Sequence, residues 1–131
     1  MPSEQAERCK TLGERCNVIE GCYEFMLAYA AQGVADGLEI REYLTSAAHA
    51  LTGLGAVARQ ELDSDFIAVL DRDASDALAA IELVLSQPAI SSQLIDNLNA
   101  SIHLRALLTD LFLIDEVLKA QRISRLAAPT N

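Results

Sequence analysis

The sequence predicts an all-α protein, and three features support this class: composition, apolar spacing and short connections. Of its 131 residues, 51% are hydrophobic but only 5% are aromatic, with no tryptophan, a balance that favours helices over sheets. Apolar residues recur at steps of three and four along four segments, as in helices packed together. Connections of roughly two to eight residues favour antiparallel neighbours. We therefore expect a single domain, residues 1–131, that forms a four-helix up-down-up-down bundle.

Four helical segments are expected, of which the first and the fourth are the longest. They cover residues 3–32, 37–62, 65–86 and 92–126. Ser3 is the expected N-cap of the first segment, and Gly33 is its C-terminal stop. Asp36 and Glu39 have the spacing of a capping box before the second segment. Pro88 ends the third, because proline cannot continue a helix.

The three cysteines are expected to be reduced and to act as small apolar residues. Cys9 and Cys16 share the apolar seam of the first helix, whereas Cys22 points about 120° away from Cys16. Three thiols so placed cannot close one metal site. The sequence also lacks the Glu-x-x-His pairs of a di-iron bundle. We expect neither a metal nor a cofactor.

Net charge and hydropathy narrow the range of partners. The formal net charge of −9 repels nucleic acid and anionic membrane surfaces. No segment approaches the roughly 20 apolar residues of a membrane span, and the N-terminal residues lack the apolar stretch of a secretory signal. We therefore expect a cytoplasmic protein whose partner is neither nucleic acid nor a membrane.

The fourth helix has more apolar surface than one bundle face needs. Its apolar residues spread over an arc of about 220° and comprise Leu104, Leu107, Leu108, Leu111, Phe112, Ile114, Val117 and Leu118. The surplus predicts a second partner, which is a second copy in a homodimer or, alternatively, a helix of another protein. The residues expected to form this dimer or partner face are Leu107, Leu111, Phe112, Ile114 and Leu118.

The end of the fourth helix is basic. Asp115 falls within the apolar arc and is expected to pair with Lys119 or Arg122, which follow it on nearly the same stripe. Past Leu118 the stripe itself becomes polar, with Lys119, Arg122 and Arg125. The last turns are therefore expected to project beyond the bundle or to cross a partner subunit.

His49 is the candidate for chemistry. It lies near the middle of the second predicted helix, roughly 180° from the apolar seam, so its imidazole is expected in solvent. Small or uncharged side chains surround it on that outer face and would let another protein surface approach the ring. These residues are Thr45, Thr52, Gly53, Ala56 and Gln60.

The segment Ala48-His49-Ala50-Leu51-Thr52-Gly53 resembles the signature of histidine-containing phosphotransfer domains. The resemblance implies that His49 accepts a phosphoryl group from the aspartate of a receiver domain, and that Gly53 leaves room for that receiver. An exposed imidazole is a suitable nucleophile, and phosphoryl transfer requires mostly positioning. Two positions depart from the family pattern: Thr52 stands in place of its lysine, and Leu54 in place of its small hydroxyl residue.

Two functions are consistent with these features. One is a small regulatory protein-interaction bundle that transfers a phosphoryl group through His49. The alternative is a non-enzymatic adaptor or chaperone-like bundle that binds a partner protein through the fourth helix. Phosphotransfer requires His49 and a receiver, whereas an adaptor should tolerate His49→Ala and lose its partner on Leu111→Asp or Phe112→Asp.

Overall fold

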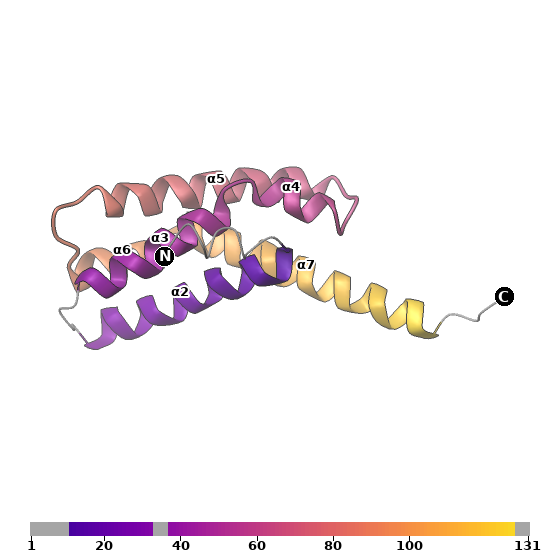
Figure 1. Cartoon of the computed structure of the whole chain (residues 1–131), viewed down its shortest axis with the longest axis horizontal. Coiled ribbons are helices and arrows are strands. Elements are labelled where there is room, and N and C mark those ends of the chain that lie inside the picture. Colours follow the sequence, from indigo (N-terminus) through magenta and orange to yellow (C-terminus); the bar gives the residue numbers. More distant parts are fainter. Residues whose placement is uncertain (1–10, 33–36, 128–131) are drawn as a thin grey trace.

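The computed structural model describes residues 11–32 and 37–127. All regular secondary structure in these ranges is helical, which confirms the all-α class, and it comprises six helices rather than four (Figure 1). They are α2 (Leu12–Gln32), α3 (Gly37–Leu51), α4 (Leu54–Arg59), α5 (Phe66–Leu85), α6 (Ser92–Ala100) and α7 (Ile102–Ala127). The expected count is wrong because two predicted helices are interrupted.

The interruptions lie at Gly53 and Ser101. Gly53 has φ 70° and ψ 20°, the left-handed conformation that commonly ends a helix and that glycine adopts without a steric penalty. It divides the predicted helix 37–62 into α3 and α4. Ser101 is extended, with ψ 139°, and its hydroxyl accepts a hydrogen bond from the amide of Leu104 at 3.3 Å. Ser101 thus ends α6 and caps α7.

Hydroxyl caps mark the starts of α2 and α6. The Thr11 hydroxyl accepts from the Glu14 amide at 3.2 Å, and α2 begins at Leu12. The expected stops and caps at Ser3, Gly33 and Asp36 lie outside the described residues. The range expected for the third helix, 65–86, is confirmed to within one residue at each end by α5. Ser91 caps α6 by accepting from the Leu94 amide at 3.0 Å.

The helices surround one apolar core. Helix α2 packs against α3 and α6, and α5 packs against α3, α4 and α7. Two polar contacts join distant segments: the Tyr29 hydroxyl donates to the Ile90 carbonyl at 2.8 Å, and the Arg41 guanidinium donates to the Leu85 and Gln87 carbonyls. The largest fully buried side chains are Met26, Ile40, Leu44, Leu54, Ile67, Leu70, Ile81, Ile95, Leu107 and Leu111.

The buried face of α2 is rotated from the predicted seam. Cys22, expected to point away from the seam, is only 2% exposed, and its thiol contacts the Met26 sulfur at 3.7 Å. Cys16, expected on the seam, is half-buried. The reason is that α2 packs against both α3 and α6, so its core face points between two neighbours rather than toward one.

Helix α4 lies close to α5 because residue 55 is glycine. A Cβ atom at Gly55 would lie 2.6 Å from Asp71 Oδ1 and 2.8 Å from Asp71 Cβ. Any larger residue would push the two helices apart. The absence of a side chain at Gly55 therefore lets α4 lie close against α5.

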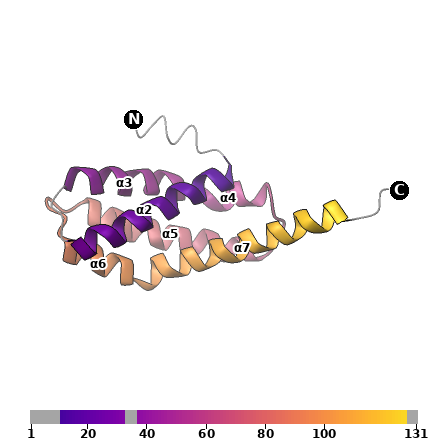
Figure 2. The ribbon, with the colours of Figure 1, turned by 90° about the horizontal axis from the view of Figure 1, so that it is seen from below.

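Helix α7 runs past the other helices, so its C-terminal half projects from the bundle (Figures 1 and 2). Ile114 is its last buried residue, and the described side chains from Asp115 to Leu126 are exposed apart from half-buried Leu118 and Gln121. The expected projection of the last turns is thus observed. Across the described ranges, no helix has the length and apolar content needed to cross a membrane.

Candidate functional site

The His49 side chain is exposed, as the helical periodicity predicted. Among the residues expected around it, Thr52, Gly53 and Ala56 are exposed and Thr45 is half-buried. The Thr52 hydroxyl donates to the Ala48 carbonyl at 2.9 Å. This hydroxyl is held by the end of its own helix and does not point freely into solvent.

The backbone after His49 differs from the expectation. His49 lies in the last turn of α3, not in the middle of a long helix, because the chain turns at Thr52 and Gly53. Gly53 adopts the left-handed backbone conformation that makes this turn. One straight helix would place Ala56 and Gln60 on the same face as His49, but the chain turns between them. Gln60 instead lines a groove between α2 and α7.

Arg15 supports the turn that follows His49. From α2, its guanidinium donates to the Ala50 carbonyl at 3.2 Å and to the Thr52 carbonyl at 2.5 Å. These are carbonyls that the end of α3 leaves without helical partners. Sequence reasoning missed this contact, since it joins residues 35 and 37 positions apart and no local pattern marks it.

The predicted partner face of the fourth helix is only partly on the surface. Leu107, Leu111 and Ile114 are 0–2% exposed within this chain's own core, so they are unavailable to a partner. The apolar arc of this helix is wide because α7 packs against both α5 and α6. Leu118 is half-buried and Phe112 is 55% exposed.

The apolar surface that α7 does expose includes two residues outside the predicted face. Leu113 is 52% exposed and Val117 is 42% exposed. A spacing of four residues places them on the same side of the helix. Together with Phe112 they form what we call the outer α7 surface. The width of the apolar arc signalled such a surface, but periodicity alone assigned the wrong members to it.

A groove of about 540 Å³ lies between α2 and the projecting part of α7. Leu12, Cys16 and Glu20 of α2 line one side, and Gln60 and Glu61, which follow α4, also border it. The α7 side comprises Leu111, Ile114, Asp115, Leu118, Gln121, Arg122 and Arg125. The groove is therefore mixed in character, lined by apolar, acidic and basic side chains.

Negative charge gathers around Cys16 within this groove. Burial, followed by the charges of Glu20, Asp115 and Glu61, raises the pKa of the Cys16 thiol to about 12. Burial alone raises that of Cys22 to about 12. Both thiols stay protonated at neutral pH, and reactive cysteines require the opposite shift. The groove thus presents three neighbouring carboxylates and no nucleophilic thiolate.

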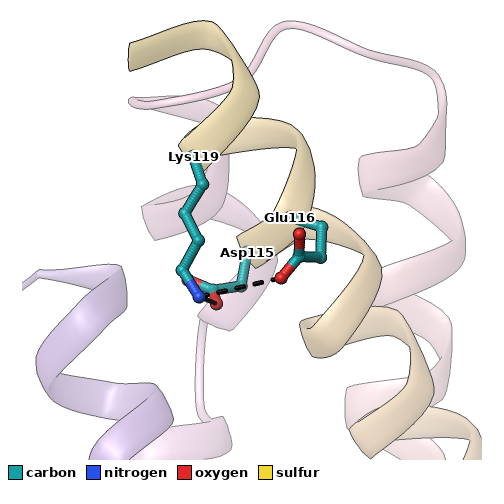
Figure 3. Close-up of polar contacts among 3 residues, drawn as sticks. All are labelled: Asp115, Glu116 and Lys119. Atoms are coloured by element: carbon teal, nitrogen blue, oxygen red, sulfur yellow. Dashed lines mark ion pairs between the residues drawn. The ribbon is translucent and has the colours of Figure 1, made fainter. Parts of the chain in front are cut away.

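The exposed ion pair on α7 involves Asp115 and Lys119, as predicted. The Lys119 ammonium lies 3.1 Å from Asp115 and 3.7 Å from Glu116 (Figure 3). The hydrogen bond with Asp115 is the main reason that the pKa of Lys119 is raised. In the part of the chain that the structure describes, Arg122 pairs with no carboxylate, so that alternative is not observed.

A carboxyl pair lies between α5 and α7. The Asp110 side chain on α7 is 6% exposed, and its Oδ2 is buried without a hydrogen-bond partner. Burial, then a hydrogen bond and the negative charge of Asp73 on α5, raises the pKa of Asp110 to about 7. Two facing carboxyl groups hold one proton near neutral pH. No local sequence pattern marks this pair, because it joins two helices.

Residues 11–32 and 37–127 contain no group of three histidine, cysteine or acidic side chains that could hold a metal ion. The chain matches no protein-family model, no curated protein and no solved structure. The arrangement of its own residues is therefore what supports a function.

Proposed function

We propose that this protein is a non-enzymatic interaction module that binds a partner protein through the outer α7 surface. The observation that carries the proposal is the exposure of Phe112, Leu113 and Val117 on one helix, each between 42% and 55%. Large apolar side chains grouped in this way are typical of sites that another protein covers.

The exposed side chains of this surface indicate the chemistry of the partner. Leu113 and Val117, one turn apart, and Phe112 beside them expose apolar side chains that fit the apolar face of a partner helix rather than a small ligand. In this proposal the interrupted pairs α3–α4 and α6–α7 each act as one helix of an up-down-up-down bundle. The module works in the cytoplasm, where its partner is also found.

The test compares the proteins retained by the immobilised wild type and by two immobilised variants. Leu113→Asp with Val117→Asp should abolish retention of the partner, because charges would replace the apolar contact. Leu83→Asp is the matched control, since Leu83 is 66% exposed on α5, away from the proposed surface. Leu111→Asp is unsuitable, because Leu111 is 1% exposed and a charge there would disrupt the core.

A protein retained by the wild type and by Leu83→Asp, and lost on the double substitution, supports the proposal. It should then bind purified wild-type protein with the same dependence on the two residues. Retention of the same set of proteins by the wild type and by both variants would refute the proposal.

Histidine phosphotransfer is the second candidate, and the exposure of His49 beside small residues favours it. Its test is the transfer of acid-labile label from phosphorylated receiver domains to the purified protein. His49→Ala should abolish labelling, while His103→Ala, which changes the other histidine of the chain, should leave it intact. Equal labelling of both variants, or none of the wild type, would refute this candidate.

A further inference from the structure

The projecting part of α7, residues 115–127, packs little against the rest of the chain, since Leu118 and Gln121 alone among its described side chains are half-buried. Thirteen residues at 1.5 Å each extend about 20 Å, which is between three and four helical turns. Helices of this length are marginal in water without tertiary contacts. Ile123 and Leu126 are nevertheless 66% and 87% exposed. A second surface that packs along the tail would therefore stabilise it.

The groove beside the tail has carboxylates whose charge is opposite to that of the tail arginines. Its α2 side and the segment after α4 contribute Glu20 and Glu61, which face the same space as Cys16. The tail contributes Arg122 and Arg125, which make no ion pair with the described carboxylates. The groove thus has carboxylates on the side of α2 and arginines on the side of α7, and the two sets form no ion pair with each other.

We propose that a second copy of this chain fills the groove. The α7 tails of the two copies run antiparallel about a two-fold axis near Leu118. The tail arginines of each copy then face the groove carboxylates of the other. Leu118, half-buried in one copy, becomes the apolar centre of the contact.

The spacing along α7 supports the antiparallel register. Asp115 lies three residues before Leu118 and Arg122 lies four residues after it, all three on one stripe of the helix. In an antiparallel pair whose two-fold axis passes beside Leu118, between positions 118 and 119, Asp115 of one copy lies opposite Arg122 of the other, twice by symmetry. Arg125, one further turn along, extends toward the groove acids Glu20 and Glu61 of the partner copy.

A second copy fits better than an unrelated helix because the surface is self-complementary. A two-fold interface uses the same patch on both copies, and this patch holds both charge signs along one line. Each copy has a net charge of −9, but repulsion between distant charges is screened beyond about 8 Å at physiological ionic strength. The contacting charges are closer than that and of opposite sign.

This contact is independent of the proposed function. It uses the groove side of α7, with Leu118, Arg122 and Arg125, whereas the proposed partner binds Phe112, Leu113 and Val117 on the outer α7 surface. Failure of one does not entail failure of the other, because each has its own substitutions and readout.

The test is a charge swap followed by analytical ultracentrifugation at concentrations up to about 100 µM, which detects Kd values in the micromolar range. The wild type should sediment as a dimer. Arg122→Glu with Arg125→Glu makes the tail acidic like the groove, and Glu20→Arg with Glu61→Arg makes the groove basic like the tail. Each double variant alone should dimerise at least about thirtyfold more weakly, because like charges would face each other.

An equimolar mixture of the two double variants should restore the dimer. In the mixed pair an acidic tail enters a basic groove, and a basic tail enters an acidic groove. Both contacts between tail and groove are therefore favourable again, and one of the two contacts between Asp115 and Arg122 is kept. Only a contact between tail and groove predicts this recovery, since any other dimer interface would respond to each variant separately.

Matched controls change the same residue types elsewhere. Arg72→Glu with Arg105→Glu, and Glu42→Arg with Glu82→Arg, alter exposed residues and the net charge by the same amounts, so they should leave the dimer intact. Circular dichroism of every variant checks the fold. Should a reversal lower the helix content, Arg122→Gln with Arg125→Gln replaces it and should still weaken the dimer.

Three results would overturn the proposal. One is a wild type that is monomeric at about 100 µM. The second is a dimer unaffected by either double variant, which would place the interface elsewhere. The third is a mixture that stays monomeric although each folded variant alone has lost the dimer, which would contradict the pairing of tail with groove.

Discussion

The carboxyl pair between α5 and α7 should make the stability of the protein fall as pH rises, and Asp110→Asn should remove this dependence. The pKa of Asp110 is raised from 3.8 to about 7 by burial and by Asp73. The folded protein therefore holds a proton that the unfolded chain has lost over this range. Stability from this group is present at low pH and is lost as pH rises through about 7.

The magnitude follows from the two pKa values. A shift of this size corresponds to about 2.6 kcal/mol of unfolding free energy lost between pH 5 and pH 8. Asp73 is half-buried, and water screens part of its charge, so we expect about 1.5 kcal/mol in practice. In Asp110→Asn the amide does not titrate, so the variant has no proton to lose at this position between pH 5 and pH 8. The variant should gain that amount over the wild type on going from pH 5 to pH 8.

The assay is guanidinium unfolding of both proteins at pH 5 and pH 8, followed by circular dichroism. Comparing the variant with the wild type at each pH cancels the titration of all other groups. Asp76→Asn is the matched control, because Asp76 is an exposed aspartate on the same helix, α5, and it should keep the wild-type pH dependence. Equal pH dependence in wild type and Asp110→Asn would refute the assignment of a shared proton to this pair.

Three further substitutions test the local packing. Gly55→Ala should lower the unfolding free energy by about 2 kcal/mol, because its Cβ would meet the Asp71 side chain. Gly21→Ala, which has nothing within 4 Å, should instead raise it by about 0.5–1 kcal/mol; a similar loss in both variants would contradict the close approach at Gly55. Gly53→Ala should cost about 1 kcal/mol in thermal unfolding because of its positive φ, and an unchanged melting temperature would contradict a fixed left-handed turn. Arg15→Met should accelerate hydrogen exchange around the turn that follows α3, since it removes two hydrogen bonds to that turn; exchange at the wild-type rate would show that these bonds do not hold the turn.

The sequence predicted helices best where the apolar period and the end signals agree. The bounds of α5 were expected to within one residue, because its period is regular and Pro88 follows it. The break at Gly53 had a signal, since glycine commonly ends helices in the left-handed conformation. That glycine was interpreted instead through the resemblance to phosphotransfer domains. Serine is a weaker signal, and nothing near Ser101 predicts the boundary between α6 and α7.

The candidate sites depend on contacts between distant segments, which periodicity does not specify. The exposure of His49 could be predicted because it depends only on the face of one helix. The Arg15 contact and the pair of Asp73 with Asp110 could not, since each joins two helices that are far apart in the sequence. Their geometry is set by how the helices pack. The groove between α2 and α7 is of the same kind.

The two proposed contacts use different sides of α7, and this separation has a consequence for stoichiometry. A dimer joined through its grooves leaves the outer α7 surface of both copies open, so it should bind two partner molecules. On a surface crowded with immobilised partner, the dimer should dissociate more slowly than Arg122→Glu with Arg125→Glu, because a bivalent molecule rebinds before it escapes. In solution, the affinity for each site should be equal in the two proteins. An affinity that falls in solution as well would show that the partner contacts the groove rather than the outer surface.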